Sequence, residues 1–272
     1  MGDVGFDAVR DLVRSGRRGA VVTVIAGESL GAKLLVSGDE VTGSLGDPAL
    51  DAEAAALARE LIPHEESGVR EAGGRSLFID VHTPQPHLLV IGAVDFTAAL
   101  ARLASSAGFR VTVVDARAHF ATAERIPDAD EIVVAWPGEY LAEHPPDDST
   151  YVAVLTHEPR FDDPTLTAVL ASSAAYVGAM GSRRAHAERV ERLLAEGVPA
   201  DRLATVSAPI GLDLGAATTE ETAISILAEI IAVKHGRSGG RLSERGRPVH
   251  ELNEREHLSA AEAEAHTPGR GA

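Results

Sequence analysis

HLLVIGAVDFTAALARLASSAGFRVTVVDAR, residues 87–117, is the clearest indication of the fold class. A short apolar run ends at Gly92, an amphipathic segment follows, and a second β-branched run ends at Asp115. This order predicts two parallel strands joined by a crossover helix. The 23 positions from Gly92 to Asp115 match the spacing of a dinucleotide-binding βαβ unit.

In such a unit the helix N-terminus faces a phosphate, and the acid at the end of the second strand binds ribose hydroxyls. Gly92 and Asp115 are therefore candidate ligand-binding residues. The glycine motif is incomplete, because Val94 and Thr97 stand where G-x-G-x-x-G requires glycine, and Asp95 adds a negative charge. This departure disfavours ordinary NAD(P) binding. The alternative is that Gly92 only permits a tight turn and that Asp115 caps the next one.

The alternation of strand and helix patterns continues to about residue 235. Strands separated by helices imply a mostly parallel sheet, so the sequence predicts a C-terminal Rossmann-like α/β domain over 87–235. The further strands are expected at 131–136, 151–156 and 175–178, and the further helices at 164–172, 184–196 and 219–235.

The first part of the chain, residues 1–83, predicts a smaller α/β domain. Its strands are expected at 20–26, 32–37, 40–44 and 76–81, with a helix that begins at Asp47 and Pro48. Thr83-Pro84-Gln85-Pro86 predicts a stiff extended linker, because each proline fixes its own φ and keeps its predecessor out of the helix. Residues 236–272 are rich in Gly, Arg, Ser, Glu and Ala and predict a mobile tail, with some helix near 258–265.

The segment AYVGAMGSRRAH, residues 175–186, predicts an anion site. A strand delivers Gly178 and Gly181, Ser182 is a suitable helix N-cap, and Arg183 follows it. Free amides, the positive end of a helix and a guanidinium group together attract a negative ligand. The alternative is that the arginines lie on a solvated helix surface.

A second loop, within SAPIGLDLGAATTEETAISILAEIIA at residues 207–232, is more elaborate than a simple connection requires. Thr218, with a glutamate three residues later, forms a capping box that starts an apolar helix. Much of the segment is structural for that reason. We expect Gly211, Asp213 and Gly215 to line a ligand cleft as well.

His157 follows the strand expected at 151–156 and lies at the edge of the sheet where open α/β folds bind ligands. It is a further candidate, although a surface histidine beside a turn is the commoner case. The hypothesis common to these sites is that Gly178, Arg183 and Gly211 come together around a small anionic ligand.

Composition narrows the function classes. With 25 Lys and Arg against 41 Asp and Glu, the formal charge of −16 disfavours a nucleic-acid partner. The absence of cysteine excludes disulfides, thiolate nucleophiles and cysteine-ligated metals. No HExxH motif, i,i+4 histidine pair or GxSxG motif is present, so we expect neither a metal site nor a catalytic residue. No long apolar run or signal segment is recognisable, and we expect a cytoplasmic protein without a membrane partner.

Three segments together resemble the XdhC/CoxI family, the accessory factors of xanthine dehydrogenase, carbon monoxide dehydrogenase and related molybdenum hydroxylases. They are THEPRFDDPTL at 156–166, AAYVGAMGSRRAHAERVERL at 174–193 and APIGLDLGAATTEETAISILAEIIA at 208–232. The resemblance implies an N-terminal XdhC/CoxI domain followed by a Rossmann-like domain. It is weaker in the N-terminal part, where it depends on residues 31–36 and 43–46.

The resemblance also implies a function. Members are molybdenum cofactor chaperones that bind molybdopterin, protect it while a cysteine desulfurase supplies its terminal sulfur, and pass it to the apo-hydroxylase. They are regarded as carriers rather than enzymes, and a homodimer is among the assemblies that such an architecture permits. Many relatives carry Gly-Gly-Cys where this chain has Gly46-Asp47-Pro48, so a role of that cysteine in handling sulfur is not available here.

Two other classes of function compete with a chaperone. The βαβ spacing favours an NAD(P)-dependent oxidoreductase, and a scaffold that contacts a hydroxylase without binding a ligand is the third hypothesis. The sequence leaves open which molybdenum enzyme is served and whether the cofactor carries a nucleotide.

Overall fold

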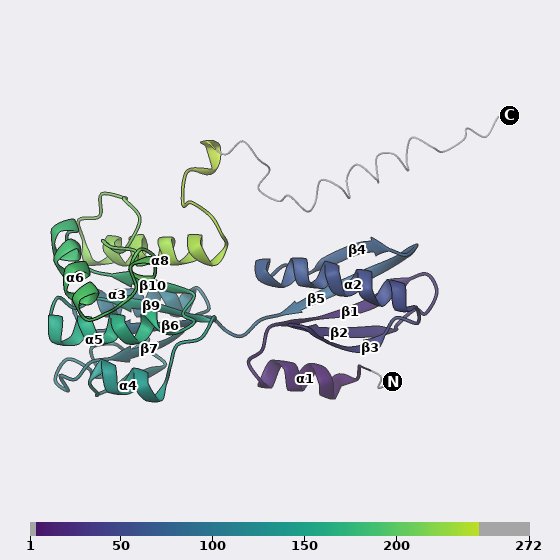
Figure 1. Cartoon of the computed structure of the whole chain (residues 1–272), viewed down its shortest axis with the longest axis horizontal. Helices are drawn as coiled ribbons and strands as arrows, with labels where there is room; N and C mark the ends of the chain where they lie inside the picture. Colours follow the sequence, from purple (N-terminus) through teal and green to yellow (C-terminus); the bar gives the residue numbers. More distant parts are fainter. Residues whose placement is uncertain (1–3, 245–272) are drawn as a thin grey trace.

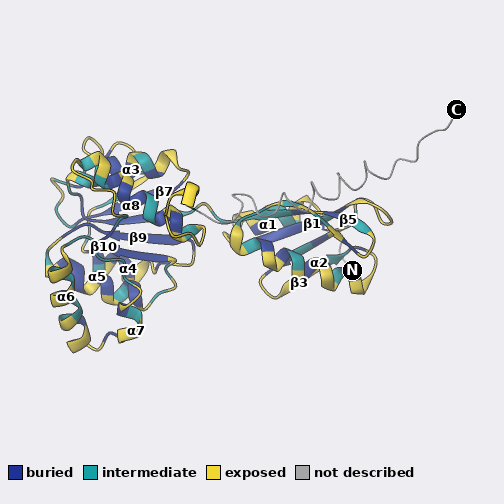
Figure 2. Cartoon of the chain, turned by 90° about the horizontal axis from the view of Figure 1, so that it is seen from above, coloured by how far each residue is buried: buried dark blue, intermediate teal, exposed yellow. Residues whose placement is uncertain are grey.

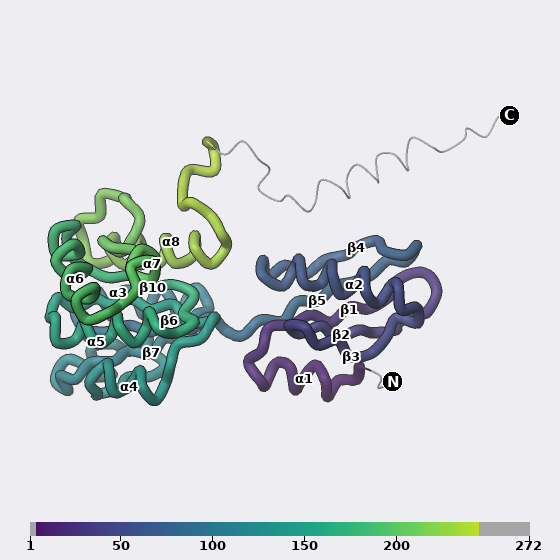
Figure 3. Tube along the Cα trace, in the orientation of Figure 1, coloured from purple at the N-terminus to yellow at the C-terminus, as the bar shows by residue number. Residues whose placement is uncertain are grey.

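The computed structural model describes residues 4–244, and its strands form two five-stranded sheets (Figure 1). Most of the tail predicted over 236–272, including its expected helix, lies outside the described residues. The first sheet is built entirely from strands before residue 83 and the second entirely from strands after residue 86. The tube trace shows a single extended segment connecting them (Figure 3).

The first sheet is antiparallel, with the strand order β3-β2-β1-β5-β4. Its strands are β1 (Gly19–Ala26), β2 (Lys33–Ser37), β3 (Glu40–Ser44), β4 (Gly68–Ala72) and β5 (Arg75–His82). The helix α2 (Pro48–Leu61) packs against it over an aliphatic core that includes Val22, Leu34 and Leu77. A short helix, α1 (Phe6–Arg14), lies beside β2.

Asp47 starts α2 as its sequence predicts. The Asp47 Oδ1 accepts a hydrogen bond from the Ala49 amide at 2.8 Å, and Pro48 occupies the first helical position, where a missing N–H costs nothing. Sequence analysis did not predict β4, because GVREA has too few apolar residues to show a strand period. The strand forms by pairing along β5.

The second sheet is parallel throughout, which confirms the predicted Rossmann-like class. Its strands are β6 (His87–Ile91), β7 (Arg110–Val114), β8 (Glu131–Val133), β9 (Thr150–Val154) and β10 (Tyr176–Ala179), in the order β10-β9-β6-β7-β8. The chain proceeds outward from β6 through β7 and β8, then returns to the other side of β6 for β9 and β10. The strand order therefore reverses between β6 and β9, which is the topological switch point.

Helices cover both faces of this sheet. On one face lie α3 (Asp95–Ser106) and α8 (Thr219–Lys234); on the other lie α4 (Pro137–Glu143), α5 (Pro159–Leu170) and α6 (Arg183–Ala195). Figure 2 shows the buried strands between these two partly exposed layers. A one-turn helix, α7 (Ala200–Leu203), follows α6. None of the helices within residues 4–244 combines the length and apolar character that a membrane span requires.

Two elements differ from their predicted bounds by three residues or more at one end. The helix α5 begins at Pro159 rather than at Pro164, so Pro164 lies inside it. Both prolines suit a first helical position, and the sequence pattern does not choose between them. The strand β8 ends at Val133, and the following residues lead into α4, which sequence analysis did not predict.

The two units also meet through charged side chains. Lys234 at the end of α8 forms an ion pair with Glu65 of the first unit. Arg18 lies 3.8 Å from the Glu65 carboxylate and donates to the Asp148 carbonyl at 3.1 Å. Arg18, Asp148 and Lys234 line a cavity of about 370 Å³ that also includes Tyr151, at the amino end of β9.

Candidate functional site

The switch point lies where β6 and β9 end side by side, with Ile91 paired to Val154. Gly92 has a φ of +108°, and a Cβ at this position would lie 2.5 Å from the Thr156 Cγ2. Glycine is therefore required by the close approach of two loops. His157 is exposed beside Thr156, so Gly92 and His157 lie at the same switch point, where Rossmann-like sheets bind ligands.

A buried threonine fixes the turn that follows Gly92. The Thr97 hydroxyl accepts from the Val94 amide at 3.1 Å and donates to the Gly92 carbonyl at 2.6 Å. Sequence analysis treated Thr97 only as a missing glycine. Its hydroxyl satisfies backbone groups that the start of a helix otherwise leaves without partners, and so it holds the loop in shape.

Asp115 is fully occupied by contacts within the protein. Its carboxylate is 1% exposed and accepts from the Ala93 amide at 2.7 Å, the Arg117 amide at 2.8 Å and the Arg117 guanidinium at 2.7 and 2.9 Å. Burial alone would raise the pKa of Asp115, but the hydrogen bonds from Arg117 and the two amides outweigh it and lower the pKa. A ribose would have to displace these bonds, so Asp115 positions the Gly92 loop instead.

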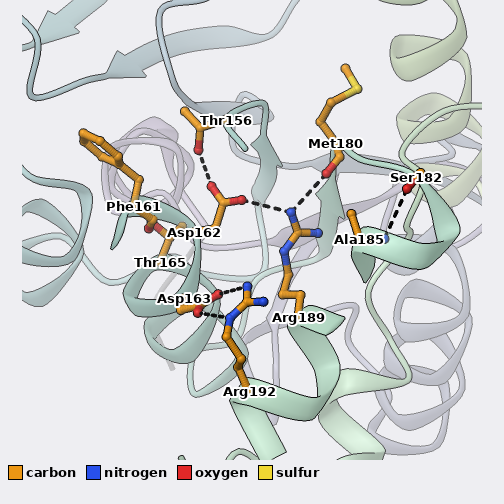
Figure 4. Close-up of polar contacts among 10 residues, drawn as sticks. All are labelled: Thr156, Phe161, Asp162, Asp163, Thr165, Met180, Ser182, Ala185, Arg189 and Arg192. Atoms are coloured by element: carbon orange, nitrogen blue, oxygen red, sulfur yellow. Dashed lines mark hydrogen bonds and ion pairs between the residues drawn. The ribbon is translucent and has the colours of Figure 1, made fainter. Parts of the chain in front are cut away.

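A second buried network connects the switch point to the loop after β10 (Figure 4). The Thr156 hydroxyl donates to Asp162, and Arg189 Nη2 contacts Asp162 Oδ2 at 2.9 Å and the Met180 carbonyl at 3.1 Å. Burial raises the pKa of Asp162, while the bonds from Thr156 and Arg189 oppose the rise. Arg189 Nη1 is buried and has no acceptor. The network connects the loops after β9 and β10 through side chains of α5 and α6.

Arg189 and Asp162 were not recognised from the sequence. The signal was present for Arg189, which lies at i+4 from Ala185 and at i−4 from Leu193, on the inward face of α6. A charged residue on such a face is expected to have a buried partner. The partner, 27 positions earlier in the chain, could not be identified from spacing.

The loop after β10, with the first residue of α6, contains three of the residues predicted to bind an anion. Gly181 has a φ of +135°, which an L-residue rarely adopts, and Ser182 is the N-cap of α6 as predicted, accepting from the Ala185 amide at 3.1 Å. Arg183 is exposed at the first helical position. Arg184 lies 3.7 Å from Glu188 and is 89% exposed, which agrees with the surface alternative.

Gly178 and Gly211 are accounted for by packing. A Cβ on Gly178 would lie 2.4 Å from the Tyr176 hydroxyl and 2.5 Å from Ile210, and one on Gly211 would lie 2.5 Å from the Ser225 hydroxyl. Both glycines therefore border filled space rather than an open pocket. The Gly211 amide and the Tyr176 hydroxyl both donate to Glu229 Oε2, at 2.7 and 2.5 Å, which anchors this segment to α8.

The remaining two candidates lie on an exposed loop. Asp213 is exposed, and Gly215, with a φ of +69°, has open space around its Cα. The capping box predicted after them is present, since Thr218 and Glu221 exchange side-chain to amide bonds of 3.1 Å each. Within residues 4–244, no group of three or more His, Asp or Glu side chains has an arrangement suited to a metal ion.

Family comparisons agree with this architecture. The model for the XdhC Rossmann domain matches residues 88–230, and the model for the XdhC and CoxI family matches residues 12–73. The chain belongs to the XdhC/CoxI family. The resemblance drawn from the three sequence segments is thereby confirmed.

Curated relatives of this XdhC-family chain carry related names. A Bacillus subtilis protein, named as a probable xanthine dehydrogenase subunit, is 31% identical over 231 residues, which cover 84% of this chain and 64% of the relative. The Escherichia coli protein named molybdenum cofactor insertion chaperone PaoD is 32% identical over 88 residues, or 32% of this chain and 28% of PaoD. The chain thus spans less than two thirds of each of these relatives.

A solved structure supports the fold. The crystal structure of a protein described as a xanthine dehydrogenase from Bacillus halodurans superposes with a TM-score of 0.65 and 24% sequence identity. The match covers 96% of this chain and 70% of the other. At this identity it supports the arrangement of the elements and carries no information about ligands.

Proposed function

We propose that this protein binds the molybdenum cofactor at the carboxyl edge of its parallel sheet and assists the maturation of a molybdenum hydroxylase such as xanthine dehydrogenase. The observation that carries the proposal is the buried guanidinium of Arg189, which lies beneath the glycine turn that opens α6 and keeps one donor group unused. The names of the relatives, which refer to xanthine dehydrogenase and to insertion of the cofactor, point the same way.

The residues of this turn fit an anionic cofactor. The first amides of α6 have no partner within the helix, and the helix dipole adds partial positive charge at the same point. Gly181 has the positive φ of the turn, Ser182 caps the helix and Arg183 supplies an exposed guanidinium. These residues would hold the phosphate end of the cofactor. When bound, the cofactor supplies the molybdenum centre.

The charged groups of the edge support a carrier rather than an enzyme. Asp115 is paired with Arg117 and Asp162 with Arg189, and both carboxylates are almost wholly buried. Carboxylates held in this way position loops and are poor proton donors or acceptors for a substrate. His157 is the exposed titratable side chain nearest in sequence to Thr156, and we assign it contact with the ligand rather than catalysis.

The supply of sulfur belongs to the same proposal. A cysteine desulfurase would act on the bound cofactor, and the carrier would then pass it to the apo-hydroxylase. Because this chain has no cysteine and carries Gly46-Asp47-Pro48, no persulfide can form on it. Any persulfide intermediate would remain on the desulfurase.

Mass spectrometry of the full chain, purified from cells with active molybdopterin synthesis, tests the proposal. We expect a retained pterin, and about a tenfold smaller retained fraction in Arg183→Ala, because one charge-assisted contact to phosphate is lost. Arg184→Ala, which changes a neighbouring arginine paired with Glu188, is the matched control. A well-folded protein that retains no form of molybdopterin would refute the proposal.

The oxidoreductase alternative depends on the topology of the sheet. Its ribose-binding acid, Asp115, is already occupied by Arg117 and Ala93, and the glycine motif before α3 is incomplete. Calorimetric titration with NADH and NADPH should therefore give weak binding or none. The scaffold alternative predicts instead that the hydroxylase complex forms equally well with Arg183→Ala and without any ligand.

A further inference from the structure

A cluster of three aromatic rings and one guanidinium group lies at the carboxyl edge, and of its members only Arg117 has been described so far. We call it the ring platform, and it consists of Arg117, Phe120, Trp136 and Phe161. Its members come from the segment after β7, from the residue before α4 and from the first turn of α5. Three separate segments thus bring flat side chains to one place.

The rings and the guanidinium are stacked. The Trp136 and Phe161 rings lie 4.8 Å apart with an angle of 20° between their planes. The Arg117 Cζ lies 4.7 Å from the centre of the Phe120 ring and 5.8 Å from that of Phe161. Such distances are typical of aromatic stacking and of cation–π contacts.

Arg117 cannot move freely within the ring platform. Its Nε and Nη2 atoms contact the two oxygens of Asp115 at 2.9 and 2.7 Å, as a fork. Asp115 is itself held by the Ala93 amide at 2.7 Å. The guanidinium plane is therefore fixed before any ligand arrives, which lowers the entropy cost of binding.

Trp136 is the exposed member. Phe161 is buried, whereas Trp136 leaves 46% of its surface exposed although one of its faces is stacked. It is the only tryptophan in a chain with 4% aromatic residues. Large rings exposed beside a ligand crevice are a usual means of binding another flat ring.

The ring platform adjoins the site proposed above. Phe161 directly precedes Asp162, the residue that receives the bonds from Thr156 and Arg189. The strands β6 and β8 are two places apart in the sheet, so the switch point and Trp136 are separated by about 10 Å across the strands. One elongated ligand could contact both.

We propose that Trp136 is the stacking surface for a planar heteroaromatic ring that carries a phosphate. The ring would lie on the face of Trp136 opposite Phe161, and the exposed guanidinium groups of Arg125 and Arg160 would attract the phosphate. A pterin phosphate and a nucleoside phosphate share this chemistry. The inference uses the proposed function only to place a ligand at this edge of the sheet.

The fluorescence of Trp136 provides a direct test, because no other tryptophan contributes emission. We would titrate the full chain with cytidine, adenosine and guanosine monophosphates, with ribose 5-phosphate as the control that lacks a ring. Neopterin monophosphate would be measured by calorimetry. We expect saturable quenching by at least one nucleotide, or saturable binding of the pterin, and no quenching by ribose 5-phosphate. Which probe binds more tightly identifies the source of the ring.

Variants then assign the binding to stacking. By calorimetry, Trp136→Ala should bind the best probe about tenfold more weakly, whereas Trp136→Phe, which keeps a flat ring, should stay within about threefold of the parent. Thermal unfolding of both variants controls for folding. If no nucleotide quenches in a saturable way and calorimetry detects no binding of any probe, the proposal is overturned, as it is by unchanged affinity in Trp136→Ala.

The two proposals can fail separately. A protein that purifies without a pterin but binds a nucleotide through Trp136 would refute the cofactor role and support the ring platform. A protein that retains its pterin equally in the parent and in Trp136→Ala, and binds no probe, would refute the ring platform alone.

Discussion

The two sheets of this protein bury different kinds of side chain. In the antiparallel sheet the core is aliphatic, and Ser37 is the only buried polar residue among the described residues of that unit. In the unit of the parallel sheet, as far as residue 244, four charged residues are buried, and they lie toward the carboxyl edge: Asp115, Asp162, Asp163 and Arg189. Buried charges cost free energy and are seldom the most stabilising choice. Their concentration at one edge indicates that they hold the loops of that edge in position and do not serve mainly to stabilise the fold.

Removal of a buried charge from the carboxyl edge should have the largest effect on the free energy of unfolding and is the strictest test of this difference between the sheets. We expect Arg189→Met to lower the free energy of unfolding by about 3 to 5 kcal/mol, because Asp162 would keep a buried charge without a partner. Urea denaturation would measure the loss. Arg184→Met, on the exposed side of the same helix, should change it by less than about 0.5 kcal/mol. Equal effects of the two variants would contradict the buried network.

The pH dependence of stability should also differ between the two sheets, because the parallel sheet contains a histidine that is largely removed from solvent. Burial and the nearby Arg110 lower the pKa of His87 from 6.5 to about 4. Well above pH 6.5 the histidine is neutral in both the folded and the unfolded state. As the pH falls toward 4 the unfolded chain gains a proton that the folded protein excludes, so stability is lost. The loss should be about 2 to 3 kcal/mol, with partial exposure allowed for.

Unfolding of His87→Gln, measured between pH 7 and pH 4, checks this expectation. The variant should show a flatter profile than the parent, since glutamine does not titrate. His64→Gln, which changes an exposed histidine of the antiparallel unit, should keep the parental profile. A parental profile in His87→Gln would show that another group is responsible.

A smaller effect is expected from the antiparallel unit. Asp47→Ala removes the side-chain cap of α2 and should lower the free energy of unfolding by about 1 kcal/mol, with no change in the retained pterin. Glu53→Ala, on the exposed surface of the same helix, is the control and should be nearly neutral. If Asp47→Ala released the pterin, the separation of roles between the two sheets would be wrong.

The smallest effect on stability is expected at Arg183. Its side chain is exposed at the start of α6, so Arg183→Ala should change the free energy of unfolding by less than about 0.5 kcal/mol. Thermal unfolding beside the mass spectrometry of the retained pterin would show whether binding and stability separate at this residue. A large loss of stability would assign Arg183 a structural role.

Much of the fold could be predicted from the sequence, since its signals are local. The apolar runs gave the strands of the parallel sheet, and Asp47, Ser182 and Thr218 marked helix starts by side-chain capping. The start of α5 could not be predicted, because Pro159 and Pro164 are equivalent as local signals.

Less of the candidate site than of the fold could be predicted from the sequence. The glycine motifs indicated turns, but Gly178 and Gly211 satisfy close packing, which depends on Tyr176, Ile210 and Ser225. The buried ion pair at the carboxyl edge could not be predicted either, because it also depends on tertiary packing. Asp162 and Arg189 come into contact only when α5 and α6 pack together, and the periodicity of the sequence does not predict that contact.

The ion pairs of Arg18 and Lys234 have a consequence for access to the proposed site. They hold the antiparallel unit against the amino ends of β9 and β10, next to Tyr151 and Ala175. Ligands are expected at the carboxyl ends of those strands. The antiparallel unit contacts the amino ends and therefore does not cover the proposed site. Under the proposed function, a recipient hydroxylase could therefore reach a bound cofactor without separation of the two units.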